Sequence, residues 1–513
     1  MVYDIPLGVS LLAVAPEIAL TVLAVIVLAL DLYWPESRRR DIAYVSGILL
    51  MAIAVIPVIV SPQAIRDELT RLNAPADVTE NMLFWGGMVR YDVLAQIFKV
   101  MVILAAGITS LMSVDVKGVG RKGEFYLIVI VSTLGMSLMS GAADLIMVFV
   151  ALETTTIPLY ILAGFKRSDT RSAESGMKYF LFGSFTSALL LYALSLLYGF
   201  TGQTSLYQLA NYFGTQAFAD NPIPVLGAMV LVVVGFGFKI SMVPFHFWTP
   251  DVYEGAPTPV TAFVSVASKA ASFALLVRFL IAVFPQTAVI GGQDMQSFWV
   301  NLIAAAAAIT MTLGNVVALV QRNIKRLLAY SSIAQAGYTL IGLAAIQSQE
   351  QGVASVAFYM FMYTFTNLLA FAVVILFSEA TNSETIADFA GLNRRSPWLA
   401  LVMTIALLSL GGVPPTAGFF GKFFVFNAAV QANLVWLAIL GVLNSIVALY
   451  YYLVVVKVMY VDRSPDEDKP IPVSSAYGWV LVITSVAILV LGTVGAQPIF
   501  EWAVNSARAL FAG

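Results

Sequence analysis

The chain has 513 residues, of which 60% are hydrophobic and 11% are charged. Soluble domains carry about 25% charged residues, so this composition excludes a soluble protein and indicates a polytopic membrane protein. The net charge of −2 gives no reason to expect a nucleic-acid partner, the absence of cysteine excludes disulfides and cysteine-bound iron–sulfur clusters, and a single histidine excludes a bis-histidine haem. We therefore expect no cofactor and no metal in this chain.

Apolar runs long enough to cross a bilayer recur along the whole sequence. Runs of about 20 residues predict about fourteen transmembrane helices, at 8–31, 42–60, 92–113, 123–140, 142–165, 174–199, 222–247, 257–284, 298–319, 325–346, 353–379, 397–428, 433–460 and 475–498. The first run is too long for a signal-peptide core and has no basic segment before it, so we interpret it as a membrane helix. The predicted fold class is an all-α polytopic membrane protein.

Basic residues cluster in alternate loops between these runs. One set of loops holds Arg38, Arg39, Arg40, Lys117, Arg121, Lys122, Lys166, Arg167, Arg171, Arg322, Lys325, Arg326, Arg394, Arg395, Arg463 and Lys469. The opposite set holds Arg66, Arg71 and Arg90, with Arg508 in the tail. Positively charged loops stay on the cytoplasmic side, so both termini should face the periplasmic side of a bacterial-type inner membrane. Loop 248–256 is an exception, because it has no basic residue and holds Asp251 and Glu254.

Two of the predicted helices contain proline close to a lysine. Lys239 lies in the middle of the seventh run and is followed by Pro244, whereas Pro414 and Pro415 precede Lys422 in the twelfth run. Proline removes a backbone N–H and clashes with the preceding turn, so each helix should break close to its charge. Paired breaks at membrane depth are the best sequence pointer to transport sites. The milder alternative is a proline kink in a continuous helix.

The order of lysine and break divides the chain. The lysine precedes the break in the first half and follows it in the second, and each half has an odd number of spans, which predicts two inverted five-helix repeats with broken helices 7 and 12. We expect four parts: an N-terminal three-helix segment with an outward loop at 62–91 (1–122), a first antiporter-like repeat (123–284), an inverted second repeat (298–460), and a C-terminal helix and tail (461–513).

Four ionisable side chains lie deep inside predicted helices, namely Glu153, Lys239, Lys269 and Lys422. Each costs about 2.5–3.5 kcal/mol at the centre of a membrane helix, so four together argue for a pathway, although a long lysine can also reach the interface. Burial favours the neutral form of a lysine and a nearby carboxylate favours the charged form, so a switching ion pair can load and unload a proton. We pair Glu153 with Lys239, expect Lys269 to pass protons across the midline, and expect Lys422 to exchange them in the far half.

The other ionisable groups within the spans have milder interpretations. Three lie near span ends, where long side chains reach the interface: Lys99, Arg278 and Lys457. Lys178, near the inside end of its span, is a candidate relay. His246, just past the first break, either relays protons or hydrogen-bonds at the break, since histidine titrates nearest neutral pH. Glu17, early in the first span, fits a structural role better than transport.

Five stretches carry a family resemblance, namely ALETTTIPLYILAGF, KRSDTRSAESGMKYFLFGSF, FKISMVPFHFWTPDVYEGAPTPVTAFVSVASKAA, QRNIKRLLAYSSIAQAGY and GGVPPTAGFFGKFFVF. They resemble the N-type membrane subunit of complex I, the proton-pumping NADH:quinone oxidoreductase. They are also similar to the second subunit of the ferredoxin-dependent cyanobacterial and plastid enzyme. A lysine on helix twelve is unlike the M-type subunit, and the lack of a long lateral helix is unlike the L-type.

The resemblance implies an antiporter-like fold of fourteen helices. It implies that a glutamate on helix five and lysines on helices seven, eight and twelve move protons, and those positions here are Glu153, Lys239, Lys269 and Lys422. It also implies that NADH, FMN, iron–sulfur clusters and quinone belong to partner subunits. The partners would be other membrane subunits of complex I, including a neighbouring antiporter-like subunit.

Two other classes of protein share parts of this pattern. An Mrp-type or stand-alone cation/proton antiporter would share the fold and the deep lysines. A sodium carrier should, however, show oxygen-rich ligand sets at the break, because hard cations prefer carboxylate and carbonyl ligands, and the chain has a single deep acid. A purely structural scaffold would leave the deep charges unexplained.

Overall fold

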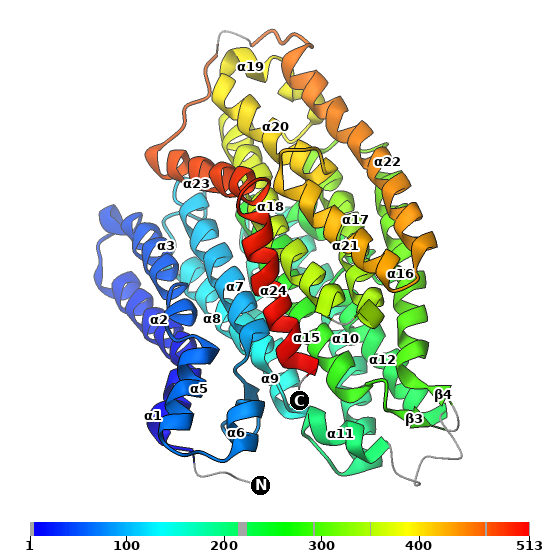
Figure 1. Ribbon diagram of the computed structural model, residues 1–513. Coiled ribbons are helices and arrows are strands. Elements are labelled where there is room, and N and C mark those ends of the chain that lie inside the picture. Colours follow the sequence, from blue (N-terminus) through cyan, green and yellow to red (C-terminus); the bar gives the residue numbers. More distant parts are fainter. Residues whose placement is uncertain (1–4, 214–222, 291–292, 349, 467–468, 512–513) are drawn as a thin grey trace.

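The computed structural model describes residues 5–213, 223–290, 293–348, 350–466 and 469–511. These residues form a bundle that is almost entirely helical (Figure 1). The N-terminal part contains α1 (Leu7–Ala13), α2 (Ala15–Tyr33), η1 (Glu36–Arg38), α3 (Asp41–Ile53), α4 (Ile56–Ile59), α5 (Pro62–Arg71), α6 (Ala76–Asn81), β1 (Leu83–Phe84), β2 (Val89–Arg90) and α7 (Val93–Met112). The short strands β1 and β2 pair antiparallel in a hairpin.

The middle of the chain contains the first interrupted helix. Its elements are α8 (Gly123–Gly141), α9 (Leu145–Ala163), α10 (Thr170–Thr201), α11 (Leu206–Phe213), α12 (Ile223–Lys239), α13 (Trp248–Gly255), α14 (Thr258–Phe263), the π-helical turn η3 (Val264–Ser268), α15 (Lys269–Val283), β3 (Val289–Ile290) and β4 (Gln293–Asp294). The strands β3 and β4 again form an antiparallel hairpin. The helices α14, η3 and α15 follow one another without a gap, so they act as one long helix with a widened turn.

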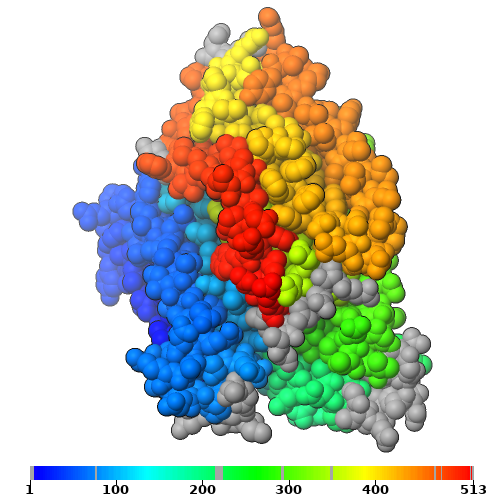
Figure 2. Space-filling model, viewed as in Figure 1, coloured from blue at the N-terminus to red at the C-terminus, as the bar shows by residue number. Residues whose placement is uncertain are grey.

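The last part contains the second interrupted helix. Its elements are α16 (Met295–Ala318), α17 (Ile324–Ala344), η4 (Ala345–Ser348), α18 (Glu350–Thr381), η5 (Ile386–Phe389), α19 (Leu392–Arg395), α20 (Pro397–Gly411), α21 (Ala417–Gln431), α22 (Val435–Tyr460), α23 (Ser475–Leu491) and α24 (Ala496–Phe511). The red helix α24 lies on the surface and packs against α18 and α7, between the N-terminal helices and the second half (Figures 1 and 2).

Within the described residues, 11 helical segments are long and apolar enough to cross a membrane. They coincide with predicted spans, and they make the chain a multi-pass all-α membrane protein. The three other predicted spans fall on interrupted elements, namely α12 with its following turn, α20 with α21, and α23 with α24, which bend by 80° at their junction. The full count of fourteen crossings therefore stays a prediction, because it depends on counting each interrupted element as one.

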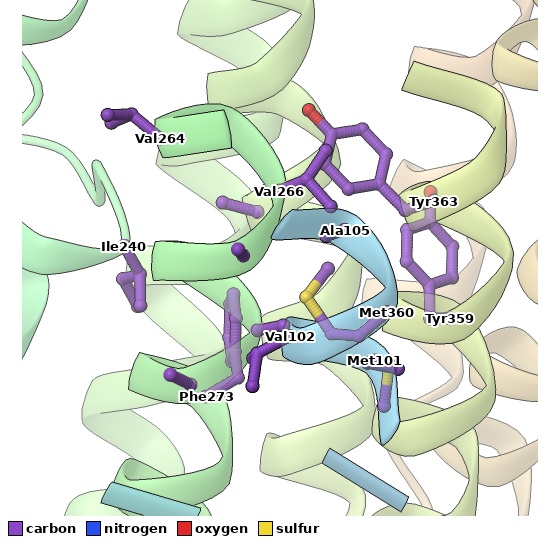
Figure 3. Packing of buried hydrophobic residues seen from close by; sticks show 14 of the residues in the cluster. Met101, Val102, Ala105, Ile240, Val264, Val266, Phe273, Tyr359, Met360 and Tyr363 are labelled. Atoms are coloured by element: carbon purple, nitrogen blue, oxygen red, sulfur yellow. The ribbon is translucent and has the colours of Figure 1, made fainter. Parts of the chain in front are cut away.

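The core joins segments that are distant in sequence. Met101 and Val102 of α7 pack against Phe273 of α15 and Met360 of α18, as Figure 3 shows. In the α14–α15 segment, 100% of the residues in the most apolar 18-residue stretch are buried, whereas in α2 the share is 28%. The segments α7, α14–α15 and α18 therefore form the centre of the bundle, and a polar group on them must find its partners inside the protein.

The prediction that Lys99 and Arg278 reach the interface is wrong. The Lys99 side chain is 0% exposed, with Nζ 2.7 Å from Glu17 Oε1. The Arg278 guanidinium is also 0% exposed and donates two hydrogen bonds of 2.7 Å to Asp92. Both residues lie on the central segments, where burial on all sides requires a paired charge. Lys457 is exposed and pairs with Asp462 at 3.3 Å, as expected for a side chain near a span end.

The acidic segment 248–256 is not the loop that the sequence predicted, because Trp248–Gly255 forms helix α13, and it has basic partners on neighbouring helices. Arg326 Nη1 lies 2.9 Å from both Asp251 Oδ1 and Glu254 Oε2, and Lys178 Nζ lies 2.7 Å from Asp251 Oδ2. Burial raises the pKa of Asp251, but its hydrogen bonds to Lys178 and Arg326 outweigh this and lower the pKa. Helix α13 therefore keeps its negative charge, which Lys178 of α10 and Arg326 of α17 neutralise in place of basic residues of its own.

Candidate functional site

The first helix break begins at a buried lysine. Helix α12 ends at Lys239, and the chain stays non-helical until α13 starts at Trp248, with a cis peptide bond between Val243 and Pro244. The freed backbone finds partners within the bundle, since Val243 N donates to Thr310 Oγ1 at 3.1 Å. The Trp248 indole donates to the carbonyl of the residue before Lys239 at 3.0 Å. These contacts fix the end of α12 and therefore the position of Lys239.

Lys239 is surrounded by neutral groups. Its side chain is buried, and Nζ donates to Tyr160 OH at 3.3 Å and to Ser187 Oγ at 3.2 Å. The Tyr160 hydroxyl has room only because residue 183 is a glycine, since a Cβ at that position would collide with the hydroxyl. Both hydrogen-bond partners of this lysine are neutral hydroxyls, and a hydroxyl can donate as well as accept.

The predicted direct pair between Glu153 and Lys239 is not formed. No ion pair joins Glu153 to any basic group in the part of the chain that the structure describes. Glu153 Oε1 and Thr156 Oγ1 are instead buried and without a hydrogen-bond partner among the described residues. Glu153, Thr156 and Tyr160 follow at spacings of three and four on α9, so they share one helix face that leads to Lys239.

Lys269 lies directly after the π-helical turn η3. Its Nζ donates to Ser332 O at 3.0 Å and to Ser332 Oγ at 2.6 Å. Tyr363 OH donates to the same Ser332 hydroxyl at 2.9 Å. A π-helical turn widens a helix locally and is frequent at functional sites, and here it aims Lys269 at α17. Lys269, like Lys239, has no carboxylate partner among the described residues.

A network of polar side chains continues from α17 toward the second break. Tyr359 donates to Gln335 Oε1, and Gln335 Nε2 donates to Leu410 O at 3.2 Å and to Tyr452 OH at 3.4 Å. The Tyr452 and Ser331 hydroxyls are also hydrogen-bonded. Leu410 belongs to the last turn of α20, so this network reaches the residues that end that helix.

A second cluster lies beside this network. Asn315 Nδ2 donates to Tyr338 OH at 3.0 Å and to Asn444 Oδ1 at 3.3 Å, and Tyr451 OH donates to Asn315 Oδ1 at 3.0 Å. The Tyr338 ring lies under the ammonium group of Lys422, 4.8 Å from Nζ to the ring centroid. Hydrogen-bonded polar side chains therefore continue from α17 to the ring that contacts Lys422.

Lys422 closes the second break. Helix α20 ends at Gly411 and α21 begins at Ala417, with a cis peptide bond between Pro414 and Pro415. Lys422 Nζ donates to Gly411 O at 2.9 Å, so the lysine satisfies a carbonyl that the break leaves without a helical partner. The three predicted lysines thus lie in one bundle, each buried and each beside an irregular turn.

Replacing Gly412 by alanine should disturb this break. Gly412 has a φ of 84°, and a Cβ there would lie 2.8 Å from Lys422 Cδ. The left-handed conformation alone costs an alanine about 1–2 kcal/mol. We expect Gly412→Ala to lower the thermal stability of the protein and to displace Lys422, measured as melting temperature and as proton transport. Gly199→Ala is the control, because nothing lies within 4 Å of that Cβ position. Equal melting temperatures for the two variants would contradict this account.

The two candidate relays lie apart from these contacts. Lys178 is 36% exposed and forms ion pairs with Glu174 at 2.8 Å and Asp251 at 2.7 Å. His246 is half-buried, and its Nδ1 has no hydrogen-bond partner in the described part of the chain. Within the described residues no hydrogen bond joins Lys178 or His246 to the deep lysines, so their relay roles stay predictions.

Sequence reasoning missed the neutral members of the site. These are Tyr160, Ser187, Ser331, Ser332, Gln335, Tyr359, Tyr363 and Tyr452. The spacing of Ser331, Ser332 and Gln335 along one predicted span was a usable signal, because polar residues one turn apart share a helix face. The tyrosines carried no such signal, since tyrosine fits ordinary packing in a membrane bundle.

Interrupted helices with buried lysines in an all-helical bundle define an antiporter-like membrane protein. A family model described as "NADH:quinone oxidoreductase/Mrp antiporter, TM" matches residues 142–448, and the chain belongs to this family. Among its relatives is "NADH-quinone oxidoreductase subunit N" of Moorella thermoacetica, 42% identical over 498 residues, which cover 96% of this chain and 98% of that protein. Another is "NAD(P)H-quinone oxidoreductase subunit 2" of Trichormus variabilis, 42% identical over 510 residues, covering 96% of this chain and 92% of that protein.

Solved structures agree with this assignment. A chain of respiratory complex I from Thermus thermophilus is 30% identical with a TM-score of 0.71, over 94% of this chain and 98% of that chain. A chain of the Mrp complex from Dietzia has a TM-score of 0.77 over 98% of both chains but is 19% identical, so it shows the fold alone.

Proposed function

We propose that this chain is a proton-translocating membrane subunit of an NADH:quinone oxidoreductase, moving protons through buried glutamate and lysine while quinone is reduced in other subunits. The observation that carries the proposal is the set of three buried lysines, Lys239, Lys269 and Lys422, each held by neutral oxygen atoms beside an irregular turn. Such a lysine can lose and regain its proton without breaking an ion pair. The names of the relatives supply the reaction that drives the transfer.

The first segment of the pathway runs from Glu153 to Lys239. Glu153 and Tyr160 are two helical turns apart on α9, about 10 Å at about 1.5 Å per residue. This distance is too long for a direct transfer. Buried polar atoms nearly always have a partner, and Glu153 Oε1 and Thr156 Oγ1 have none in the described protein, so water bridges them. The proton then passes by way of the Tyr160 hydroxyl to Lys239.

The second segment joins Lys239 to Lys269. The Tyr160 ring contacts the Tyr179 ring edge-on, with centroids 4.9 Å apart. Tyr179 in turn interacts with Ser268, the residue before Lys269. Both tyrosines are buried and are polar only at their hydroxyls. A hydroxyl can accept one proton while donating another, which supports transfer without a net charge on either ring.

The third segment runs from Lys269 to Lys422. Ser332 accepts from Lys269 and lies on α17 one turn from Gln335, whose amide reaches the end of α20 at Leu410. Lys422 binds the next carbonyl, that of Gly411. Lys422 is therefore the terminal exchange group of the proposed pathway.

The partners and orientation follow from the same proposal. No group of three or more histidine, cysteine or acidic residues that could hold a metal occurs among the described residues. NADH, FMN, iron–sulfur clusters and quinone are assigned to partner subunits, and both termini to the periplasmic side. The two five-helix units, 123–284 and 298–460, are inverted repeats, and the reversed order of lysine and break supports this.

Purification in mild detergent and reconstitution test the function. The chain should co-purify with the other membrane subunits of an NADH:quinone oxidoreductase, and vesicles carrying the complex should acidify when NADH and quinone are supplied. A chain that purifies alone and exchanges sodium for protons would be the Mrp-type alternative. The likeness to the Mrp complex extends only to the fold, so we favour the quinone-linked function.

Replacing Thr156 by valine should slow proton transfer. Valine keeps the shape of threonine but removes the hydroxyl that has no protein partner and lies between Glu153 and Tyr160. We expect fewer protons pumped per NADH, measured by dye quenching in vesicles. The control is Thr154→Val on the same helix, because that exposed hydroxyl only donates to Val150 O. If the two variants pump equally, the water-bridged segment is wrong.

A further inference from the structure

A polar cavity opens on the face of the bundle that carries the basic loops. Its volume is about 360 Å³, and its lining comes from the α9–α10, α13–α14 and α16–α17 connections and the end of α18 with the loop after it. The charged residues of the lining are Lys166, Asp169, Arg171, Glu254, Lys325, Glu379 and Glu384. Because these side chains cannot be satisfied by lipid, water fills the cavity.

Lys325 forms the floor of this cavity. Its side chain is 3% exposed, and Nζ donates to Glu254 O and Ala256 O, both at 2.8 Å. The only carboxylate within 4.0 Å of it among the described residues is Glu384, at 3.2 Å. An unpaired buried ammonium would be costly, so Glu384 is the group that balances this charge.

Glu384 is the member of the pair that cavity water reaches. Its side chain is 21% exposed, against 3% for Lys325. Its other oxygen accepts from Asn323 Nδ2 at 3.3 Å, and its carbonyl accepts from Ile324 N at 2.8 Å. The carboxylate is therefore fixed at the start of α17, between the water and the lysine.

The floor of the cavity faces Lys269. Lys325 and Ser332 are two turns apart on one face of α17, about 10 Å at about 1.5 Å per residue, and Ser332 binds Lys269. Tyr253, next to Glu254 in sequence, places its ring 5.9 Å from Lys269 Nζ. The Tyr253 hydroxyl is fully buried and interacts with the side chain of Ser332, the residue that accepts from Lys269.

We propose that this cavity is the proton entrance to Lys269 and that the Lys325–Glu384 pair is its gate. The inference rests on the proposed function. Glu384 takes a proton from cavity water and becomes neutral, which opens its ion pair with Lys325. Glu384 then gives that proton to a water on the Lys269 side of the pair, and the ion pair with Lys325 forms again. The Tyr253 and Ser332 hydroxyls each accept one proton and donate one, and the proton ends on the unprotonated amine of Lys269.

Reconstituted vesicles of the whole complex test the gate. Pumping per NADH oxidised is compared among wild type, Lys269→Ala, Glu384→Gln, Tyr253→Phe and the matched control Glu379→Gln. Glu379 lines the same cavity but bonds Lys117 rather than Lys325. We expect proton transfer through this chain to fall about tenfold or more in Glu384→Gln and Tyr253→Phe, because a positioned proton-transfer group contributes on the order of 10²-fold. Glu379→Gln should stay near wild type.

A double variant separates proton transfer from charge balance. The double variant Lys325→Met with Glu384→Gln removes both charges of this pair, so a purely structural pair would recover normal pumping, whereas a gate that carries the proton would not. Recovery in the double variant, or normal pumping in both Glu384→Gln and Tyr253→Phe while Lys269→Ala is impaired, would overturn the gate alone. Normal pumping in Lys269→Ala would overturn the proposed function itself.

Discussion

Replacing Lys239 by alanine, or Glu153 by glutamine, is expected to remove most of the proton pumping that depends on this chain while the complex still assembles. Lys239 binds two hydroxyls and no carboxylate among the residues that the structure describes, so its removal leaves no unpaired charge behind in that part of the chain. A lysine at the centre of a membrane helix costs about 2.5–3.5 kcal/mol, so alanine there does not weaken insertion. Glutamine keeps the shape of Glu153 but cannot take up a proton.

The measurement is the ratio of protons pumped to NADH oxidised in reconstituted vesicles, with subunit content checked on native gels. Lys457→Ala and Glu174→Gln are the controls, because Lys457 pairs with Asp462 near a helix end and Glu174 is an exposed partner of Lys178. Near-normal pumping in both Lys239→Ala and Glu153→Gln would place these residues off the pathway. Loss of the subunit from the complex would instead indicate a structural role.

Lys422→Arg should block proton exchange at the second break although the positive charge is kept. Arginine stays protonated at any usable pH, whereas a buried lysine can be emptied. Lys422 Nζ binds Gly411 O at 2.9 Å and lies 4.8 Å from the Tyr338 ring centroid, so an arginine can keep both interactions but cannot release the proton. We expect an assembled complex with most of this chain's pumping lost.

Two controls distinguish loss of exchange from crowding by the larger side chain. In Lys422→Met the new side chain is neutral and slightly smaller than arginine. This variant should lose pumping as well, since neither methionine nor arginine can release and take up a proton there. Lys457→Arg makes the same change at an exposed position and should pump normally. Full pumping by Lys422→Arg would rule out a proton-exchanging role for Lys422.

Local rules in the sequence were sufficient for much of the fold. Span length follows from the thickness of the bilayer, and 11 segments meet it where apolar runs predicted them. The interruption after Lys239 and the one before Lys422 follow from proline chemistry, which acts over a few residues. The depth of Glu153, Lys239, Lys269 and Lys422 within their runs was also readable, because it requires only counting along one helix.

The partners of these charges could not be read in the same way. Lys99 and Arg278 were placed at an interface because they lie near the ends of their runs, yet both are fully buried in ion pairs. The end of a run says nothing about which neighbouring helix covers it. For Arg278 the partner Asp92 is 186 residues away, at the position just before another central helix, α7.

The sequence by itself therefore determined the class of membrane protein, the interrupted helices and the four deep ionisable groups, since hydrophobic length, proline and desolvation act locally. Only the tertiary structure decided that Lys239 binds Tyr160, which is 79 residues away along the chain, and not Glu153. It likewise decided that Lys269 binds Ser332, which is 63 residues away. It also decided that Lys325 lines a polar cavity and pairs with Glu384, 59 residues away. Those pairings depend on which helices pack together, and packing is set by the whole buried surface of the bundle rather than by any one segment.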